Sequence, residues 1–351
     1  MRQLLFISSI LFLFLNLIAC SKKDGYECFT ENLDLKLIDD IVVYDNNNHV
    51  AFTCLRKYKD DYYLAFREGN NHRPMSKDEY GKIVLLRFNK CKWEKIAVLA
   101  DNDKDLRDPY LLVKDNKLII YCGYNKIKDN TYAHSGTAYC IFQESSNNTF
   151  VDIVHDAPHV IWLWKIREYE GKYYGVGYLE TENPRLMQSV DGIHWNTVSI
   201  IPLNNCSEAD LLFKADSLFV CIRQEGAGNV SYFGKSYYPF SEIEWIEMDI
   251  SVASPELCLY SNNQVLLAGR EYSFSRKNLL DSINVSLFIL ETTGRTRRRL
   301  NVFDTGRLGD KGYPSFCMLN NGEILMSYYM GASNKSVIKV ASMIPKEFCE
   351  E

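Results

Sequence analysis

The chain has 351 residues, 13% of them aromatic, and a formal net charge of −5 at pH 7. Proteins that bind nucleic acid present a basic face, so this acidic balance predicts no nucleic-acid partner. The one basic run, Arg295–Arg299, is more typical of a solvated hairpin, and the length suffices to bury one large core.

The N-terminus has the features of an export signal followed by a lipid-attachment point. Arg2 precedes an apolar run from Leu4 to Ile18, which is too short for a comfortable membrane span. The letters LIAC at positions 17–20 resemble a bacterial lipobox. We therefore expect a signal peptide over residues 1–19, lipid on Cys20 and a tether over residues 20–27. The protein would then be exported and held by lipid alone on a bacterial membrane, at the outer-membrane, periplasmic or surface face.

The remainder, residues 28–351, is predicted to form a single all-β domain. Short apolar runs rich in β-branched and aromatic residues are separated by turns that contain Asn, Asp and Gly. Six times, two such runs flank a turn, and the turns centre on Asp61, Asn116, Gly171, Asp216, Asn263 and Gly322. A hairpin repeat of this length indicates the blades of a propeller. We predict a six-bladed β-propeller, with a five-bladed one as the alternative, closed by strands from residues 26–45, from residues 337–343, or from both.

The cysteine pattern gives no sign of a metal. Most of the cysteines that follow Cys20 lie in apolar strand patterns, where a buried thiol behaves as a small hydrophobe. Because there is no CxxC pair and no Cys/His ligand spacing, we expect neither a metal nor a cofactor. Cys28 and Cys349 flank the domain and could form a disulfide that closes the ring.

Polar side chains recur at one end of the predicted hairpins. Both strands of a hairpin rise about 3.3 Å per residue, so the residues eight or nine positions before each turn centre and those six or seven positions after it meet at one rim. The first-strand positions are Thr53, Asp108, Leu163, Glu208, Pro255 and Tyr313, and the second-strand positions are Arg67, Cys122, Tyr178, Arg223, Arg270 and Tyr328. This register gathers two carboxylates, a tyrosine and three arginines at the mouth of the central pit. Converging guanidinium groups suit a ligand that carries a carboxylate.

These residues resemble the sialidase superfamily of six-bladed propeller glycosidases. The resemblance rests on SEADL at 207–211 with Arg223, on Arg270, on GYPS at 312–315, and on a shortened Asp-box turn at 189–195. It implies a retaining glycoside hydrolase that removes terminal acidic sugars, with Tyr313 as nucleophile and Glu208 as the base that activates it. Arg223 and Arg270 would be two members of the carboxylate-binding arginine triad.

Two parts of the family pattern have no direct counterpart. The letters FTCL at 52–55 stand where sialidases carry an F/Y-R-I-P arginine, and Arg67 is the expected replacement. For the acid/base role, Glu68, His72 and Asp78 follow the first hairpin and Asp108 opens the second repeat; of these we assign Asp108 to catalysis. Glu68 and His72, close together after the first hairpin, are further substrate-binding candidates.

Two other functions remain open. The triplet Arg107-Asp108-Pro109 resembles that of five-bladed furanosidases, which favours a furanoside-directed glycosidase. A propeller that acts on uronic-acid polysaccharide, as a glycosidase or a lyase, is a further possibility. Alternatively, the chain is a non-catalytic glycan-binding surface lipoprotein that keeps the arginine pocket but lacks a working acid. For the sialidase-like hydrolase we expect a monomer whose partner is a glycan with an acidic sugar.

Overall fold

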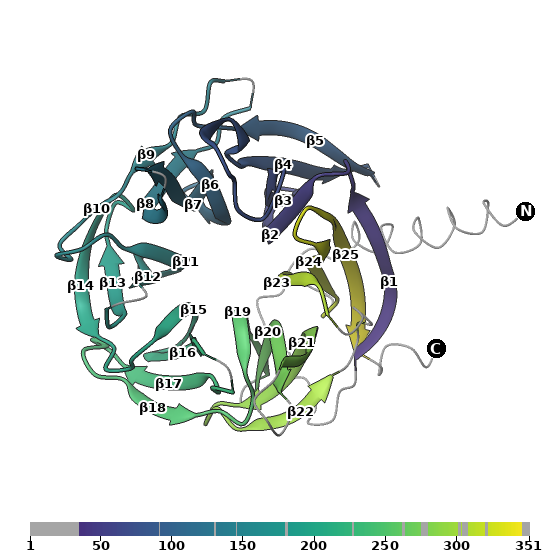
Figure 1. The fold of residues 1–351 in the computed structure, drawn as a ribbon. Coiled ribbons are helices and arrows are strands. Elements are labelled where there is room, and N and C mark those ends of the chain that lie inside the picture. The colour runs from purple at the N-terminus through teal and green to yellow at the C-terminus, as the bar shows by residue number, and fades with distance from the viewer. Residues whose placement is uncertain are drawn as a thin grey trace, which may run out of the picture.

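The computed structural model describes residues 35–345, apart from residues 91, 130, 145, 180–181, 227, 262–263, 275–279, 301–302, 304–307 and 320–321. The expected signal peptide, Cys20, the tether and the Cys28–Cys349 pair lie outside the described residues. Six β-sheets are arranged as a ring around a central axis (Figure 1). The six-bladed propeller is therefore confirmed, and the five-bladed alternative is wrong.

Each blade is built outward from a strand that lies next to the axis. The innermost strands are β2 (His49–Tyr58), β6 (Asp105–Lys114), β11 (Trp162–Tyr169), β15 (Cys206–Lys214), β19 (Val252–Ser261) and β23 (Asp310–Met318). The second strands are β3 (Asp61–Gly69), β7 (Lys117–Lys128), β12 (Lys172–Tyr178), β16 (Ser217–Gln224), β20 (Gln264–Phe274) and β24 (Ile324–Ala332). The six hairpins predicted from the sequence are these pairs.

The third strands are β4 (Lys82–Asn89), β8 (Thr131–Ile141), β13 (Arg185–Ser189), β17 (Tyr232–Tyr237), β21 (Leu280–Glu291) and β25 (Lys335–Pro345). The outer strands are β5 (Lys92–Leu99), β9 (Val151–Asp152), β14 (His194–Ile200), β18 (Glu244–Glu247), β22 (Thr296–Leu300) and β1 (Leu35–Tyr44). Strand β10 (Val154–His155) pairs with β14 in parallel, and the short 3-10 helix η1 (Lys77–Glu79) lies in the loop between β3 and β4. Strand β1 pairs antiparallel with β25, so both segments expected to close the ring belong to the sixth blade.

Apolar side chains fill the spaces between neighbouring blades. One buried cluster joins the first three blades and includes Leu111, Tyr121 and Trp195, and another joins the sixth blade to the first through Phe52 and Tyr329. This packing holds the ring together without help from disulfides among the described cysteines, which are all free. Within the described ranges, no helix has the length and hydropathy needed to cross a membrane.

The turn between β13 and β14 has the capping geometry that its sequence predicts. Asp191 Oδ1 accepts hydrogen bonds from the backbone N–H groups of Ile193 and His194, both at 2.8 Å. The buried Trp195 indole donates to the Gly192 carbonyl at 3.0 Å. The turn therefore stabilises the third blade and has no part in the central pit.

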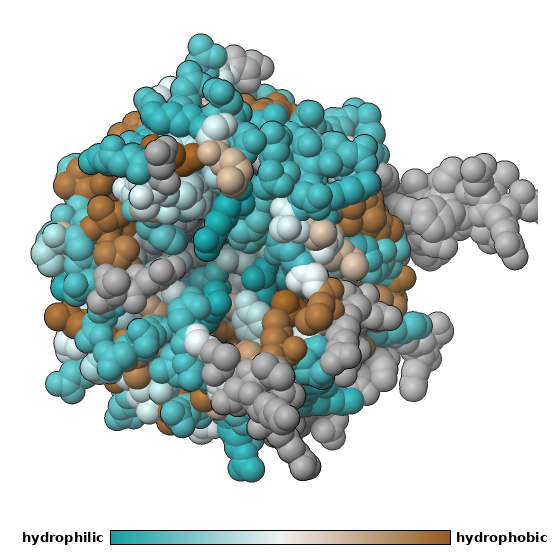
Figure 2. Space-filling model, viewed as in Figure 1, coloured by the Kyte–Doolittle hydropathy of each residue, from teal (hydrophilic) through white to brown (hydrophobic). Residues whose placement is uncertain are grey.

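A β-bulge interrupts every inner strand at the same level. The antiparallel register shifts between residues 51 and 54, 107 and 110, 164 and 167, 206 and 209, 253 and 256, and 312 and 315. In five of the six bulges the first residue has a positive φ: Phe52 (64°), Asp108 (46°), Lys165 (34°), Ser254 (48°) and Tyr313 (50°). Bulky residues rarely adopt this conformation, and strained bulges redirect side chains next to functional sites. Here they surround the axis, where the face seen in Figure 2 is hollowed and largely hydrophilic.

Candidate functional site

The centre of the candidate site is a hydrogen bond between two bulges that lie 105 positions apart in the sequence. The Tyr313 hydroxyl of the sixth blade donates to Glu208 Oε1 of the fourth. Glu208 Oε2 accepts the Ser254 backbone N–H at 2.6 Å, and the Ser254 hydroxyl accepts the Tyr313 N–H at 3.1 Å. The bulges of the fourth, fifth and sixth blades are thus linked to one another. The predicted contact between Glu208 and Tyr313 is present.

The electrostatics of this pair keep the proton on the phenol at rest. Burial raises the pKa of Tyr313 well above its ordinary value, and the Glu208 and Asp108 charges raise it further. Burial alone would raise the pKa of Glu208, but the Arg223 charge and the Tyr313 hydrogen bond hold it below its ordinary value. The carboxylate is therefore ionised and already in contact with the proton that it would have to accept.

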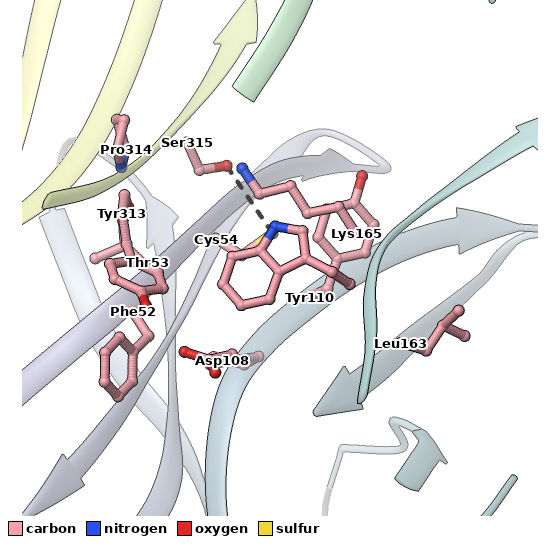
Figure 3. Close-up of a pocket in the computed structure, with 12 residues that line it drawn as sticks. Phe52, Thr53, Cys54, Asp108, Tyr110, Leu163, Lys165, Tyr313, Pro314 and Ser315 are labelled. Carbon is pink, nitrogen blue, oxygen red and sulfur yellow. Dashed lines mark hydrogen bonds between the residues drawn. The ribbon is translucent and has the colours of Figure 1, made fainter. Parts of the chain in front are cut away.

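Asp108 lies in the same pocket, and the properties of its carboxyl group suit proton transfer. Burial raises its pKa to about 7; the Arg107 charge opposes this rise and the Glu208 charge adds to it. Its Oδ1 is buried and has no hydrogen-bond partner among the described residues. Figure 3 shows the Asp108 carboxyl pointing toward the side of the pocket where Tyr313 and Phe52 lie. A carboxyl group with such a pKa can both give and take a proton near neutral pH.

The pocket around these groups is small and partly aromatic. Its empty volume is about 350 Å³, and its lining includes Phe52, Asp108, Trp164, Lys165 and Tyr313 (Figure 3). The Trp164 ring lies 5.6 Å from the Tyr313 ring, centroid to centroid, and its indole N–H has no partner within the described part of the chain. The pocket thus offers an unpaired donor on Trp164 and an unpaired acceptor on Asp108.

Arg223 and Arg270 both reach the Tyr313–Glu208 pair, as the register predicted. Arg223 Nη1 lies 3.3 Å from Glu208 Oε2, and its Nη2 lies 2.8 Å from Glu225. The Arg270 guanidinium carbon lies 5.1 Å from the centroid of the Tyr313 ring. It comes this close because residue 312 is glycine: a Cβ there would lie 2.6 Å from Arg270 Nε, and the φ of +135° also suits glycine.

Arg67 does not offer its guanidinium to the pit, which corrects its predicted role. Its side chain is fully buried, and its Nη2 forms an ion pair of 2.8 Å with Asp105 of the second blade. A Cβ on Gly81 would lie 2.2 Å from Arg67 Nε, so the guanidinium is packed against bare backbone. Arg67 therefore joins the first blade to the second. The sequence register placed it at the correct rim but could not reveal the partner that turns it away.

Glu68 is likewise engaged elsewhere. It is 6% exposed, and its carboxylate accepts the Tyr44 hydroxyl at 2.6 Å and pairs with Lys82 Nζ at 3.0 Å. These contacts tie β3 to β1 of the sixth blade and to β4. The geometry gives Glu68 this structural role in place of the predicted ligand contact.

His72 lies at the rim in a polar cluster that sequence reasoning did not assemble. Its Nδ1 is 2.7 Å from Asp310 Oδ2, and His49 Nε2 is 2.8 Å from the same oxygen. Arg107, which the sequence marked only through the Arg-Asp-Pro triplet, has Nη2 3.2 Å from His72 Nε2. The sequence did carry a signal for the bulges beside this cluster, because proline follows Asp108, Ser254 and Tyr313. A residue without an N–H fits a bulge better than a regular strand.

A second charged cluster occupies the axis further along the inner strands. Lys165 Nζ is 2.5 Å and Arg56 Nη1 is 3.0 Å from the buried Glu256 carboxylate, while Arg167 Nη2 is 2.5 Å from Asp210. These ion pairs join the first, third, fourth and fifth blades.

The sequence matches no family model and no curated protein, whereas the fold matches known structures. A protein of unknown function from Dyadobacter fermentans has 17% identity and a TM-score of 0.73 over 89% of this chain and 99% of that one. A Trypanosoma rangeli sialidase mutant that displays trans-sialidase activity has 12% identity and a TM-score of 0.59, over 88% of this chain and 58% of that one. The NanB sialidase of Streptococcus pneumoniae has 8% identity and a TM-score of 0.58, over 86% of this chain and 70% of that one. The chain therefore has a sialidase-like propeller fold.

Proposed function

We propose that this chain is a retaining glycoside hydrolase that releases a terminal acidic sugar, sialic acid or a related one, from glycans. The observation that carries the proposal is the partly buried hydrogen bond from the Tyr313 hydroxyl to the ionised Glu208. A tyrosine nucleophile is neutral at rest, so it can approach an anionic sugar without the repulsion that a carboxylate would meet. Arg223 and Arg270 beside it are suited to hold the carboxylate of that sugar.

The proposed reaction has two steps. In the first, Tyr313 Oη attacks the anomeric carbon, its proton passes to Glu208, and Asp108 gives a proton to the departing glycosidic oxygen. In the second, Asp108 takes a proton from water, the water oxygen displaces Tyr313 from the anomeric carbon, and Glu208 returns the proton to the phenolate. The high pKa of Tyr313 and the low pKa of Glu208 mean that the phenol loses its proton only as positive charge develops on the sugar.

The first test is the release of free sialic acid from mixed α-linked sialosides by the purified protein and by Tyr313→Phe. We expect release by the parent with retention of the anomeric configuration, and none by the variant. Binding of the sugar should survive, since the phenylalanine ring keeps the shape of the pocket. A folded parent that binds sialosides without cleaving them would indicate the glycan-binding lipoprotein instead. An unsaturated product would indicate a lyase.

We also propose that the protein acts as a monomer, exported and anchored through lipid on Cys20, with an Asp-box turn at residues 189–195. The support is the apolar N-terminus ending in LIAC and the S-x-D-G-x-x-W pattern. Replacing Cys20 by Ser should release the protein from the membrane fraction. If Cys20→Ser stays there to the same extent as the parent, the anchor is not this lipid.

A further inference from the structure

The guanidinium group of Arg107 lies at one side of the candidate site, where the sequence register did not place it. The Arg107 guanidinium carbon lies 4.8 Å from the centroid of the Phe52 ring, and that ring lies 4.6 Å from the Tyr313 ring. Arg270 lies over Tyr313 in the same way, at 5.1 Å. Two guanidinium groups therefore cover two adjacent aromatic rings, and one of these rings is the proposed nucleophile.

Some of the N–H groups of Arg107 form hydrogen bonds that hold its side chain in place. Its Nη1 donates to the His72 carbonyl at 2.7 Å and to the Tyr132 hydroxyl at 2.8 Å, and its Nη2 donates to His72 Nε2 at 3.2 Å. A guanidinium has five N–H donors. Among the described residues, the Nε–H and the second Nη2–H have no hydrogen-bond partner. Two donors of a rigid fork are thus left for a ligand, on a side chain that is 8% exposed.

The contact between Arg107 and His72 determines which ring nitrogen of His72 carries the proton. An arginine can only donate, so His72 Nε2 must accept and its proton must sit on Nδ1. That Nδ1–H then donates to Asp310 Oδ2 at 2.7 Å. The other oxygen of Asp310 accepts the Tyr329 hydroxyl at 2.6 Å and lies 3.4 Å from Arg270 Nη2. One carboxylate therefore holds Arg270 directly and Arg107 through His72.

The same tautomer argues against a metal at this cluster. His49, His72 and Asp310 place three potential ligand atoms within 4.8 Å of one another. A metal on His72 Nδ1 would require the proton on Nε2, which would then face the N–H of Arg107. A cation would also meet the charges of Arg107 and Arg270, both of which contact the cluster.

We propose that Arg107 is a substrate-binding residue that supplies, from the second blade, the guanidinium missing from the first, and that His72 and Asp310 position it. This inference rests on the proposed function, because it assigns Arg107 to the carboxylate of the acidic sugar. The three guanidinium groups come from the second, fourth and fifth blades. Arg67, which the sequence favoured for this role, instead holds Asp105, the residue that accepts the Tyr132 hydroxyl beside Arg107.

The test is the Kd of free sialic acid and of glucuronic acid, measured by calorimetry, with galactose as a neutral sugar. Arg107→Met should weaken binding of the acidic sugar by roughly 10- to 100-fold, the range of a lost charge-assisted hydrogen bond, and Arg107→Lys should weaken it less. Galactose binding should not change. The matched control is Arg87→Met, because Arg87 lies on β4 and pairs with Glu144 at 3.3 Å, outside the pit. Melting temperatures verify that each variant is folded.

His72 is tested by two conservative changes that separate its two contacts. Glutamine can place a carbonyl near the position of Nε2 and accept from Arg107, whereas asparagine keeps only the donor to Asp310. We expect His72→Gln to weaken binding of the acidic sugar less than His72→Asn does, because only glutamine keeps the acceptor for Arg107, and both variants to bind it more weakly than the parent, because each loses one of the two contacts. In an Arg107→Met background the His72→Asn change should have no further effect on Kd, since it acts through Arg107.

The outcomes separate this inference from the proposed function. If Arg223→Met loses binding while Arg107→Met does not, the assignment of Arg107 is wrong and the proposed function stands. If the parent cleaves no glycoside but binds an acidic sugar through Arg107, the inference stands without the enzyme. If the parent neither binds an acidic sugar nor cleaves a sialoside, both are overturned.

Discussion

The raised pKa of Asp108 predicts a change in stability that can be measured before any substrate is known. The folded protein disfavours the charged form of Asp108, whose pKa rises from 3.8 to about 7 on burial. For a raised pKa, the stability of the folded state is intact below pH 3.8 and declines as the pH rises toward 7. Asparagine has a similar shape and no charge. Asp108→Asn should therefore stabilise the protein at high pH.

The size of the effect follows from the two pKa values. Each pKa unit corresponds to 1.36 kcal/mol, so the loss of folding stability caused by Asp108, relative to low pH, is at most about 2 kcal/mol at pH 5 and about 4 kcal/mol at pH 8. These are upper values because Asp108 is partly exposed to solvent. The stabilisation by Asp108→Asn should thus grow by about 2 kcal/mol between pH 5 and pH 8.

The assay is urea denaturation of the parent and the variant at pH 5 and pH 8. Asp60→Asn, at an exposed turn position between β2 and β3, is the matched control and should show no such dependence on pH. The same Asp108→Asn variant should lose 10²- to 10⁴-fold of its glycosidase activity, and less on aryl glycosides whose leaving groups need no proton. An equal stability change at both pH values would refute the reasoning, because the pKa of Asp108 in the folded protein would then not be raised.

Two further predictions concern the residues that support the site. Gly81→Ala should destabilise the protein by about 2 kcal/mol or more, since its Cβ would lie 2.2 Å from the buried Arg67, and denaturant unfolding measures this. Its control is Gly171→Ala, where nothing lies within 4 Å and only the φ of +77° opposes alanine; an equal loss in both would contradict the packing argument. Glu256→Gln should cost about 3–5 kcal/mol because it leaves Lys165 and Arg56 short of a buried partner charge. Burial alone would raise the pKa of Glu256, but the Lys165, Arg56 and Arg167 charges hold it below its ordinary value of 4.5, so this stabilisation is present above pH 4.5 and lost as the pH falls. Equal stability of the parent and Glu256→Gln at neutral pH would exclude this contribution of the Glu256 ion pairs.

The strand pairing was predictable because it depends on local patterns. Apolar runs on both sides of a turn define a hairpin, and the turn fixes which residues of its two strands lie at the same end. This is why Glu208, Arg223, Arg270 and Tyr313 could be assigned to one rim from positions alone. The blade that closes the ring was also suggested by strand-like residues at both ends of the domain, now β1 and β25.

The direction of each side chain at that rim was not predictable. Arg67 and Arg270 occupy equivalent places on their second strands, opposite Ala51 and Ala253. Arg67 is drawn into an ion pair with Asp105 of the next blade, whereas Arg270 lies against Gly312 and over Tyr313. The difference arises from residues on neighbouring blades, which a repeat pattern within one blade does not contain.

The sequence by itself thus predicted six blades, the register of the hairpins and the rim that Glu208 and Tyr313 share, because these follow from periodicity and turn position. The pairing of Tyr313 with Glu208 came from the resemblance to sialidases. Only the tertiary structure decided that Arg67 and Glu68 are structural, that Asp108 has an unpaired oxygen and a raised pKa, and that Arg107 lies beside His72 and Asp310. The physical reason is that burial and charge pairing at the axis depend on how six blades meet, and these contacts join residues far apart in the sequence, such as His49 and Asp310, which are 261 positions apart.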